Sequence, residues 1–297
     1  MRKSIVPLAV ALIFLGCSNA QTENKTGNDS LTDSVKHSDS TTTNVPEFQS
    51  GNSDSLDAKG IEFGFCNTQG NKVLLLADSL PKNSGFSVID ADREISVLMA
   101  FRKKQIATSE DNGRQTEYNF ENCDGYLFEI KGRPADSKNS VVFLSPEFLT
   151  GRTYFKVTDV ASKQLPAEIR SRVEADKNRK IKNFRCLTSI DKNRSVYIFE
   201  FEAKKDSALA ALAYITPDKI VYENFPAKYD ETSTWRVDDG GQFGVEYFEL
   251  LAVFEKDGRI ELVTDWPGAE GYATSYLREN GATFKELKSC SRYTAPL

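Results

Sequence analysis

Carboxylates next to tryptophans are the residues of this sequence with the clearest capacity for chemistry. They are Asp238, Asp239, Asp265 and Glu270, with the neighbouring aromatic residues Trp235 and Trp266. Glycoside hydrolysis needs only two carboxyl groups at a suitable separation, and an indole ring offers a flat apolar surface to a sugar. The same residue types also suit glycan binding without catalysis. Because spacing in sequence does not fix separation in space, both interpretations stay open.

The distribution of histidine excludes the commonest hydrolase designs. The chain has one histidine, His37, and it lies in a polar N-terminal stretch outside the expected domain. A Ser-His-Asp or Cys-His arrangement needs a histidine beside its nucleophile, and many zinc sites use imidazole ligands. We therefore expect neither arrangement in the folded part, and no cofactor or metal.

Four widely spaced cysteines follow Cys17 along the chain. They show no Cys-x-x-Cys spacing, which excludes the usual short redox and zinc motifs. An even number of cysteines in an exported chain favours two disulfides, and four cysteines allow three connectivities. We predict the pairs Cys66–Cys123 and Cys186–Cys290, since each pair then stays within one half of the domain.

The N-terminus has the layout of a secretory signal. Arg2 and Lys3 precede an apolar run at residues 5–15, which ends at Gly16-Cys17. A helix of that length rises only about 16 Å, whereas the hydrocarbon core of a bilayer is about 30 Å thick. The run is therefore too short to remain as a spanning anchor.

The sequence Leu15-Gly16-Cys17 resembles the lipobox of bacterial lipoproteins. The resemblance implies that signal peptidase II cleaves before Cys17 and that Cys17 carries a lipid, so that its acyl anchor makes the lipid bilayer a partner. A rival site lies after Ala20, where the small residues also fit ordinary cleavage. That cleavage would release a soluble protein.

Residues 18–58 are rich in Ser, Thr, Asn and Asp and contain few large apolar residues, so we expect a disordered acidic linker there. Such a linker suits a tethered domain, and it favours the lipid anchor. The folded region is expected at 59–297. The formal net charge of the chain is -5 with no basic stripe, which argues against nucleic-acid binding.

Short apolar runs separated by turn residues predict a mainly β fold of antiparallel meanders, propeller-like or sandwich-like. A helix at 165–175, with Pro166 near its start, is expected to connect two β-rich halves, 59–163 and 181–297. Residues 207–213 fit either a second short helix or part of a strand. The strands predicted before the helix are 61–65, 72–77, 95–101, 116–120, 126–130 and 140–144.

The last sixty residues or so predict a four-stranded meander. Its strands are expected at 247–254, 260–264, 272–278 and 284–287, with turns at 256–258, 266–268 and 280–281. Asp257-Gly258 and Asn280-Gly281 are typical hairpin turns, because Gly supplies the positive φ that such turns require.

One part of this meander resembles the FG-GAP or VCBS-type repeat, whose acidic loop binds calcium and which often builds β-propellers. The matching positions are Glu255, Asp257, Gly258, Glu261 and Leu262. The chain departs from the pattern where Val253 replaces an acidic ligand and Lys256 replaces a glycine. A lysine within a calcium loop adds repulsion, so we expect no metal there.

These patterns together predict a non-enzymatic lipoprotein of the bacterial cell envelope, on the periplasmic side or at the cell surface. Its β-domain would present loops to a protein or glycan partner. The alternative is a carboxylate-based carbohydrate-active enzyme that uses the acids named at the outset.

Overall fold

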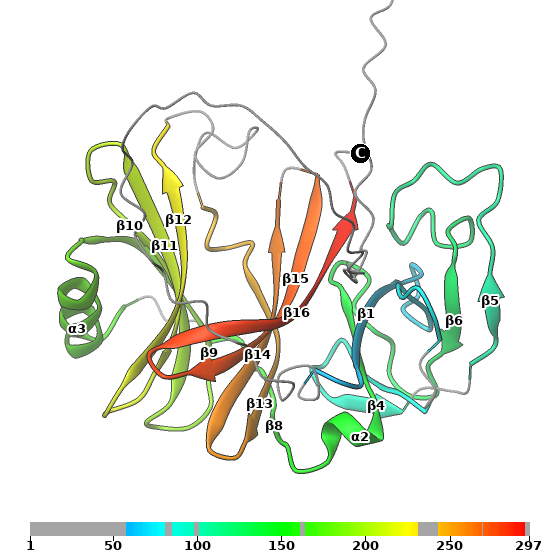
Figure 1. Cartoon of the computed structure of the whole chain (residues 1–297), viewed down its shortest axis with the longest axis horizontal. Helices are drawn as coiled ribbons and strands as arrows, with labels where there is room; N and C mark the ends of the chain where they lie inside the picture. The colour runs from blue at the N-terminus through cyan, green and yellow to red at the C-terminus, as the bar shows by residue number, and fades with distance from the viewer. Residues whose placement is uncertain are drawn as a thin grey trace, which may run out of the picture. The chain divides into compact units, whose positions relative to one another are not determined.

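The computed structural model describes residues 58–80, 85–97, 101–160, 164–230, 243–268 and 270–294. All of them belong to one compact unit, Ser50–Leu297. The strands of two β-sheets account for about half of the described residues, which confirms the expected mainly β fold of antiparallel meanders (Figure 1). Cys17, His37, Trp235, Asp238 and Asp239 lie outside the described residues.

The smaller sheet has seven strands and is antiparallel throughout, in the order β4-β3-β7-β1-β2-β6-β5. Its strands are β1 Ile61–Cys66, β2 Lys72–Leu75, β3 Ser87–Ile89, β4 Ile95–Val97, β5 Lys103–Gln105, β6 Gly125–Glu129 and β7 Val141–Leu144. Apolar residues cover both of its faces, since successive side chains on β1 enter different hydrophobic clusters.

The larger sheet has nine strands in the order β8-β13-β14-β15-β16-β12-β11-β10-β9. Its strands are β8 Thr153–Phe155, β9 Ile181–Ser189, β10 Ser195–Phe201, β11 Ser207–Ile215, β12 Ile220–Lys228, β13 Glu249–Lys256, β14 Arg259–Pro267, β15 Gly271–Asn280 and β16 Thr283–Tyr293. The expected C-terminal meander is confirmed as β13–β16. Among the described strands, only β12 and β16 pair in parallel.

Helix α3, Ala167–Lys177, confirms the expected helix, and a short helix, α2, spans Pro146–Leu149. Pro166 precedes α3, and Asn178 ends it in the left-handed conformation that closes many helices. The buried Val173 belongs to a hydrophobic cluster shared with β9, β10 and β11. Since α3 follows β8 and precedes β9, it connects the two edge strands of one sheet rather than two separate halves.

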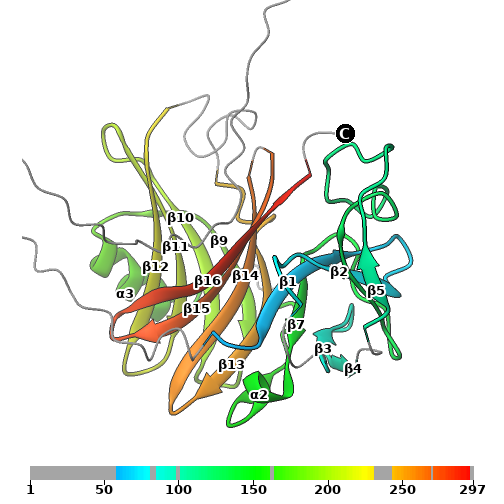
Figure 2. The same cartoon turned by 45° about the vertical axis from the view of Figure 1, so that its right-hand side comes forward.

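The nine-stranded sheet curls, so that its two edges approach each other (Figure 2). The guanidinium of Arg185 on β9 donates to the carbonyl oxygens of Glu246 and Phe248 at 3.0 Å each, close to the start of β13. A large apolar cluster that includes Leu212, Trp266 and Leu277 packs on the inner face of this curl. We call this surface the inner face.

The opposite face of β13–β16 packs against the smaller sheet. Phe63 of β1 and Val142 of β7 share one hydrophobic cluster with Phe254, Val263 and Tyr276 of the larger sheet. This shared core joins the two sheets into one unit, and β8, from the expected first half, is itself a strand of the larger sheet.

Two local predictions are wrong, and one open alternative is decided in favour of a strand. Residues 116–120 form turns instead of a strand, because the Asn119 side chain donates to Asp111 Oδ1 and to the Arg114 carbonyl. Residues 207–213 belong to strand β11, whose apolar side chains are buried on both faces. The expected turn at 266–268 begins later, since β14 continues through Pro267.

Candidate functional site

Asp265 lies between the two sheets, where it cannot meet a substrate. Its side chain is 0 % exposed. One carboxyl oxygen accepts from the Ser140 backbone N–H at 2.9 Å, and the other lies 3.1 Å from Ser140 Oγ and 2.8 Å from Thr274 Oγ1. Burial raises the pKa of Asp265, while these hydrogen bonds and the charge of Arg292 act to lower it. Asp265 therefore ties β7 to the larger sheet.

The acids of the turn that resembles a calcium-binding repeat do not come together. Glu255 pairs with Arg194 at 2.7 Å, whereas Glu261 is fully buried and pairs with Arg152 at 2.7 Å. Asp257 occupies the hairpin turn with a positive φ of 52°. Alternation along the paired strands places Glu255 and Glu261 on opposite faces of the sheet. Within the described residues, no group of three His, Cys, Asp or Glu could hold a metal ion.

Neither predicted disulfide is present in the structure. Cys66, Cys123 and Cys186 are free buried thiols. Cys66 belongs to the cluster on one face of the smaller sheet, whereas Cys123 packs with Phe65 on the other face. Cys186 lies in the cluster under α3, and Cys290 packs against the core between the two sheets. The residues of each predicted pair thus face different parts of the core.

Burial also determines how these thiols react. It raises the pKa of both Cys66 and Cys123 to about 12 and raises that of Cys186 as well. In a Cys17→Ser, Cys290→Ser variant of the full chain, we expect the three buried thiols to resist a thiol-directed reagent at about pH 8 and to react quickly in urea, because the thiolate is the reactive form. Rapid labelling of the native variant would contradict this burial.

Trp266 lies on the inner face within an aromatic group that also contains Phe225, Phe243 and Phe248. The ring centroid of Trp266 lies 5.1 Å from both Phe225 and Phe243. Its Nε1 is buried and has no acceptor within the described part of the chain. Glu270 lies apart from Asp265, exposed in the loop between β14 and β15. The structure therefore does not join Asp265 and Glu270 into one site.

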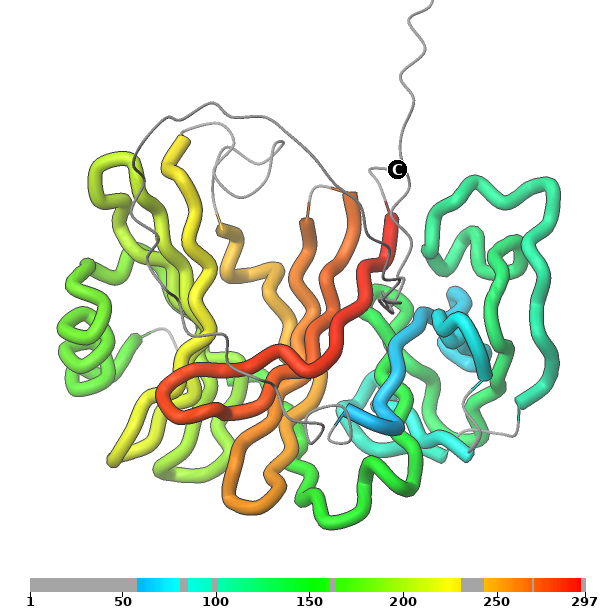
Figure 3. The backbone as a smooth tube through the Cα atoms, viewed as in Figure 1, coloured from blue at the N-terminus to red at the C-terminus, as the bar shows by residue number. Residues whose placement is uncertain are grey.

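The most distinctive feature of the larger sheet is the separation of β12 from β16. Elsewhere in the core of this sheet, neighbouring strands pair over most of their length, but β12 and β16 share a single register pair, Tyr222↔Thr283. Figure 3 shows β16 beside β12 only near the tip of the β15–β16 hairpin. We call the region in which residues 223–228 of β12 and 284–292 of β16 do not pair with each other the β12–β16 divergence.

Polar side chains line the inner face at the divergence. Glu223 is opposite Leu212 and Glu286 is opposite Leu277, and both leucines belong to the inner-face cluster. Directly opposed residues of antiparallel strands project to the same face, so both carboxylates lie on the inner face. The Glu286 carboxylate accepts from the hydroxyls of Ser275 and Ser289, each at 2.7 Å.

The two carboxylates influence each other. Burial raises the pKa of Glu223, and the negative charge of Glu286 raises it further. Within the described residues, neither Glu223 nor Glu286 forms an ion pair. Since Phe225 lies two residues beyond Glu223 on the same face, the divergence combines negative charge, hydroxyl groups and aromatic rings. This combination suits the recognition of a polar, extended ligand.

No family model, curated protein or solved structure matches this chain.

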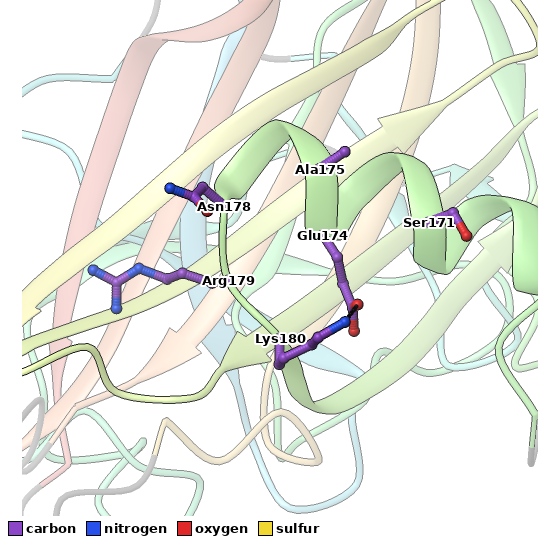
Figure 4. Close-up of a pocket in the computed structure, with 6 residues that line it drawn as sticks. All are labelled: Ser171, Glu174, Ala175, Asn178, Arg179 and Lys180. Atoms are coloured by element: carbon purple, nitrogen blue, oxygen red, sulfur yellow. Dashed lines mark hydrogen bonds and ion pairs between the residues drawn. The ribbon is translucent and has the colours of Figure 1, made fainter.

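A hollow of about 550 Å³ lies beside the end of α3 (Figure 4). Its charged side chains already bind one another or the backbone. Glu174 accepts from Lys180 Nζ at 2.6 Å and from the Ile181 N–H at 3.2 Å, and Arg179 donates to the Ser207 carbonyl at 2.9 Å. We therefore prefer the divergence as the candidate site. Within the described residues, no helix is long and apolar enough to cross a bilayer.

The sequence predicts Trp266 as a candidate site residue but does not predict Glu223 or Glu286. Each lies in an ordinary strand pattern, with no motif around it. A usable signal was the placement of an acid next to large apolar residues on the same side of a strand, as in Val221, Glu223 and Phe225. An acid at such a position is costly to bury, which marks it for a role beyond packing.

Proposed function

We propose that the chain is a non-enzymatic lipoprotein of the bacterial cell envelope that binds a protein or glycan partner at the β12–β16 divergence. The observation that carries the binding proposal is the separated pair of strands, with aromatic and hydrogen-bonding side chains along its inner face. A sheet that parts in this way leaves backbone groups and side chains accessible to a ligand. The domain would act by holding its partner near the membrane.

The enzyme alternative has less support. Catalysis on a glycosidic bond needs two carboxyl groups on either side of one substrate position. Asp265 is enclosed between the sheets by Ser140 and Thr274, and Glu270 is exposed in a separate loop. Neither is placed to act with the other, so a binding role fits the described residues better.

The aromatic group provides a test of the binding site. A Trp235→Phe background leaves Trp266 as the only tryptophan, so its fluorescence reports on the inner face. We expect a soluble β-1,4-linked glycan or a partner peptide to shift the emission, and a Glu223→Gln variant in the same background to bind about tenfold more weakly. The control is Glu110→Gln, which changes an exposed acid in the loop before β6. Equal binding by both variants would contradict this site.

The membrane address is tested separately. The proposal places a lipid on Cys17, with export ahead of it, and the linker at 18–58 between the lipid and the domain. Replacing Cys17 with Ser is expected to abolish labelling by a radioactive fatty acid and to release the chain from the membrane fraction. Membrane retention that is unchanged in this variant would overturn the anchor. Cleavage after Ala20 in the wild-type chain would overturn it as well.

A further inference from the structure

The chain contains two Asn-Gly dipeptides, Asn112-Gly113 and Asn280-Gly281. In such a pair, the glycine nitrogen can attack the side-chain carbonyl carbon of the asparagine, because a residue without a Cβ leaves that nitrogen unshielded. The attack closes a cyclic succinimide and releases ammonia. Its rate in a folded protein depends on how the surrounding groups hold the nitrogen and the amide. In the structure, these surroundings differ between the two dipeptides.

Asn112 and Gly113 lie in the loop between β5 and β6, where both residues are exposed. The Gly113 backbone N–H donates to Asp111 Oδ1 at 2.9 Å. A carboxylate is therefore in place to accept the proton that the attacking nitrogen must lose. A Cβ built on Gly113 would meet no atom within 4 Å, so the space around this residue is open.

A second hydrogen bond acts on the amide that is attacked. The Arg114 backbone N–H donates to Asn112 Oδ1 at 3.0 Å, which holds the Asn112 side chain against the backbone that follows it. As the nitrogen–carbon bond forms, Oδ1 gains negative charge, and a backbone N–H at this distance stabilises such an oxyanion. Residues 111–114 thus provide a proton acceptor for the nucleophile and a hydrogen-bond donor for the developing charge.

Asn280-Gly281 lacks both contacts in the described part of the chain. It lies at the tip of the β15–β16 hairpin, where Asn280 pairs with Thr283 and the Tyr222 N–H donates to the Ala282 carbonyl at 3.0 Å. No described side chain accepts from the Gly281 N–H, and no described donor binds the Asn280 side chain. This second dipeptide is therefore an internal control for the first.

We propose that Asn112 is a self-modification site, at which the folded loop converts asparagine into aspartate and isoaspartate with water as the only co-reactant. The Gly113 nitrogen bonds to Cγ of Asn112 while the bond from Cγ to Nδ2 breaks. The proton that Gly113 loses passes through the Asp111 carboxylate to the leaving nitrogen, which departs as ammonia. Water then opens the succinimide at either carbonyl. Both products carry a new negative charge, and isoaspartate lengthens the main chain by one carbon atom.

The modification acts on a loop that holds the end of β16. The Gln115 N–H donates to the Tyr293 carbonyl at 2.7 Å, and Gln115 Oε1 accepts from the Tyr293 N–H at 3.0 Å. Asp111 Oδ1 also accepts from Asn119 Nδ2 at 2.7 Å. A new charge beside Asp111 and a longer main chain would disturb both contacts. We therefore expect faster hydrogen exchange at Tyr293 after Asn112 has converted.

The test follows both dipeptides by peptide mass spectrometry while the full chain is kept in detergent at neutral pH. We expect Asn112 to convert about tenfold faster than Asn280, through a species that has lost ammonia. In urea the two rates should become similar, because unfolding removes both hydrogen bonds. An Asp111→Asn variant keeps the shape of the acceptor without its basicity and should slow the conversion of Asn112 about tenfold. Asn112→Gln, whose longer side chain misplaces the carbonyl carbon, should abolish it.

Two results would overturn the proposal. If Asn112 in the folded chain converts no faster than Asn280, or no faster than it does in urea, the loop does not promote the reaction. If Asp111→Asn converts at the parental rate, the carboxylate does not accept the proton. The rate at Asn280, measured in the same samples, is the internal standard for each variant, and circular dichroism confirms that each variant is folded.

Discussion

Replacing Arg152 with Ala is expected to lower the free energy of unfolding by about 3 kcal/mol. The Arg152 side chain is 3 % exposed and that of Glu261 is 0 % exposed, with Nε and Oε2 2.7 Å apart. Removing the guanidinium leaves a buried carboxylate whose nearest remaining cation, Arg278, lies 3.6 Å from the other oxygen. Arg152 also donates to the Phe148 carbonyl at 2.6 Å, so the loop after α2 would loosen as well.

Urea denaturation measures this loss, and Lys59→Ala is the matched control. Lys59 pairs with Glu147 at 2.9 Å, but both side chains are well exposed. An exposed ion pair contributes less than about 1 kcal/mol. A double variant, Arg152→Met with Glu261→Leu, should recover part of the lost stability, since it removes both buried charges together. If Arg152→Ala unfolds at the same urea concentration as Lys59→Ala, the buried pair is not important for stability.

Replacing Asp265 with Ala is expected to cost about 3 kcal/mol, because it removes the acceptor for three buried donors. The Ser140 N–H, Ser140 Oγ and Thr274 Oγ1 all lie within 3.1 Å of its carboxyl oxygens. The buried Arg292 would lose a nearby negative charge at the same time. Thr68→Ala serves as the control, since its hydroxyl makes only an exposed bond of 3.4 Å. A loss equal to that of Thr68→Ala would contradict the proposed tie between the sheets.

The contribution of Asp265 to the free energy of unfolding depends on pH in a definite direction. Burial raises the pKa of its carboxyl above the ordinary value of about 4. The folded protein then binds this proton at a pH where the unfolded chain does not, so the contribution of Asp265 to stability increases as the pH falls through that window and decreases as the pH rises through it. The stability of the wild type relative to Asp265→Asn should therefore improve as the pH falls toward the ordinary carboxyl pKa of about 4. A relative loss over this range would mean that the hydrogen bonds outweigh burial.

Local patterns in the sequence predicted most of the strands, the connecting helix and the C-terminal meander. They succeeded where large apolar residues alternate along a strand, as in β1, or where residues typical of helix ends are present, as at Pro166 and Asn178. They left residues 207–213 open between a helix and a strand, because alanines that favour a helix are here buried on both faces of a central strand. Tertiary packing outweighs intrinsic propensity in such a segment.

The site was less predictable than the fold. Asp265 and Trp266 are neighbours in sequence, but strand alternation sends one between the sheets and the other to the inner face. The cysteine pairing was wrong for the same reason, since Cys66 and Phe65 face opposite ways. The divergence itself depends on where β12 and β16 stop pairing, which no local signal encodes. Contacts between distant strands determine that geometry.

The position of α3 between the two edge strands has a consequence for the order of folding. Strands β9 to β12 pair with their neighbours in sequence, and so do β13 to β16. By contrast, Phe155 of β8 pairs with Val253 of β13, which lies about a hundred residues later in the sequence. Contacts between residues far apart in sequence form late, because the entropic cost of closing the loop between them must be overcome first. During synthesis, the β9–β12 segment can form while β8 has no partner. We therefore expect the edge at β8, and the core it shares with the smaller sheet, to be the last part of the protein to become protected from hydrogen exchange.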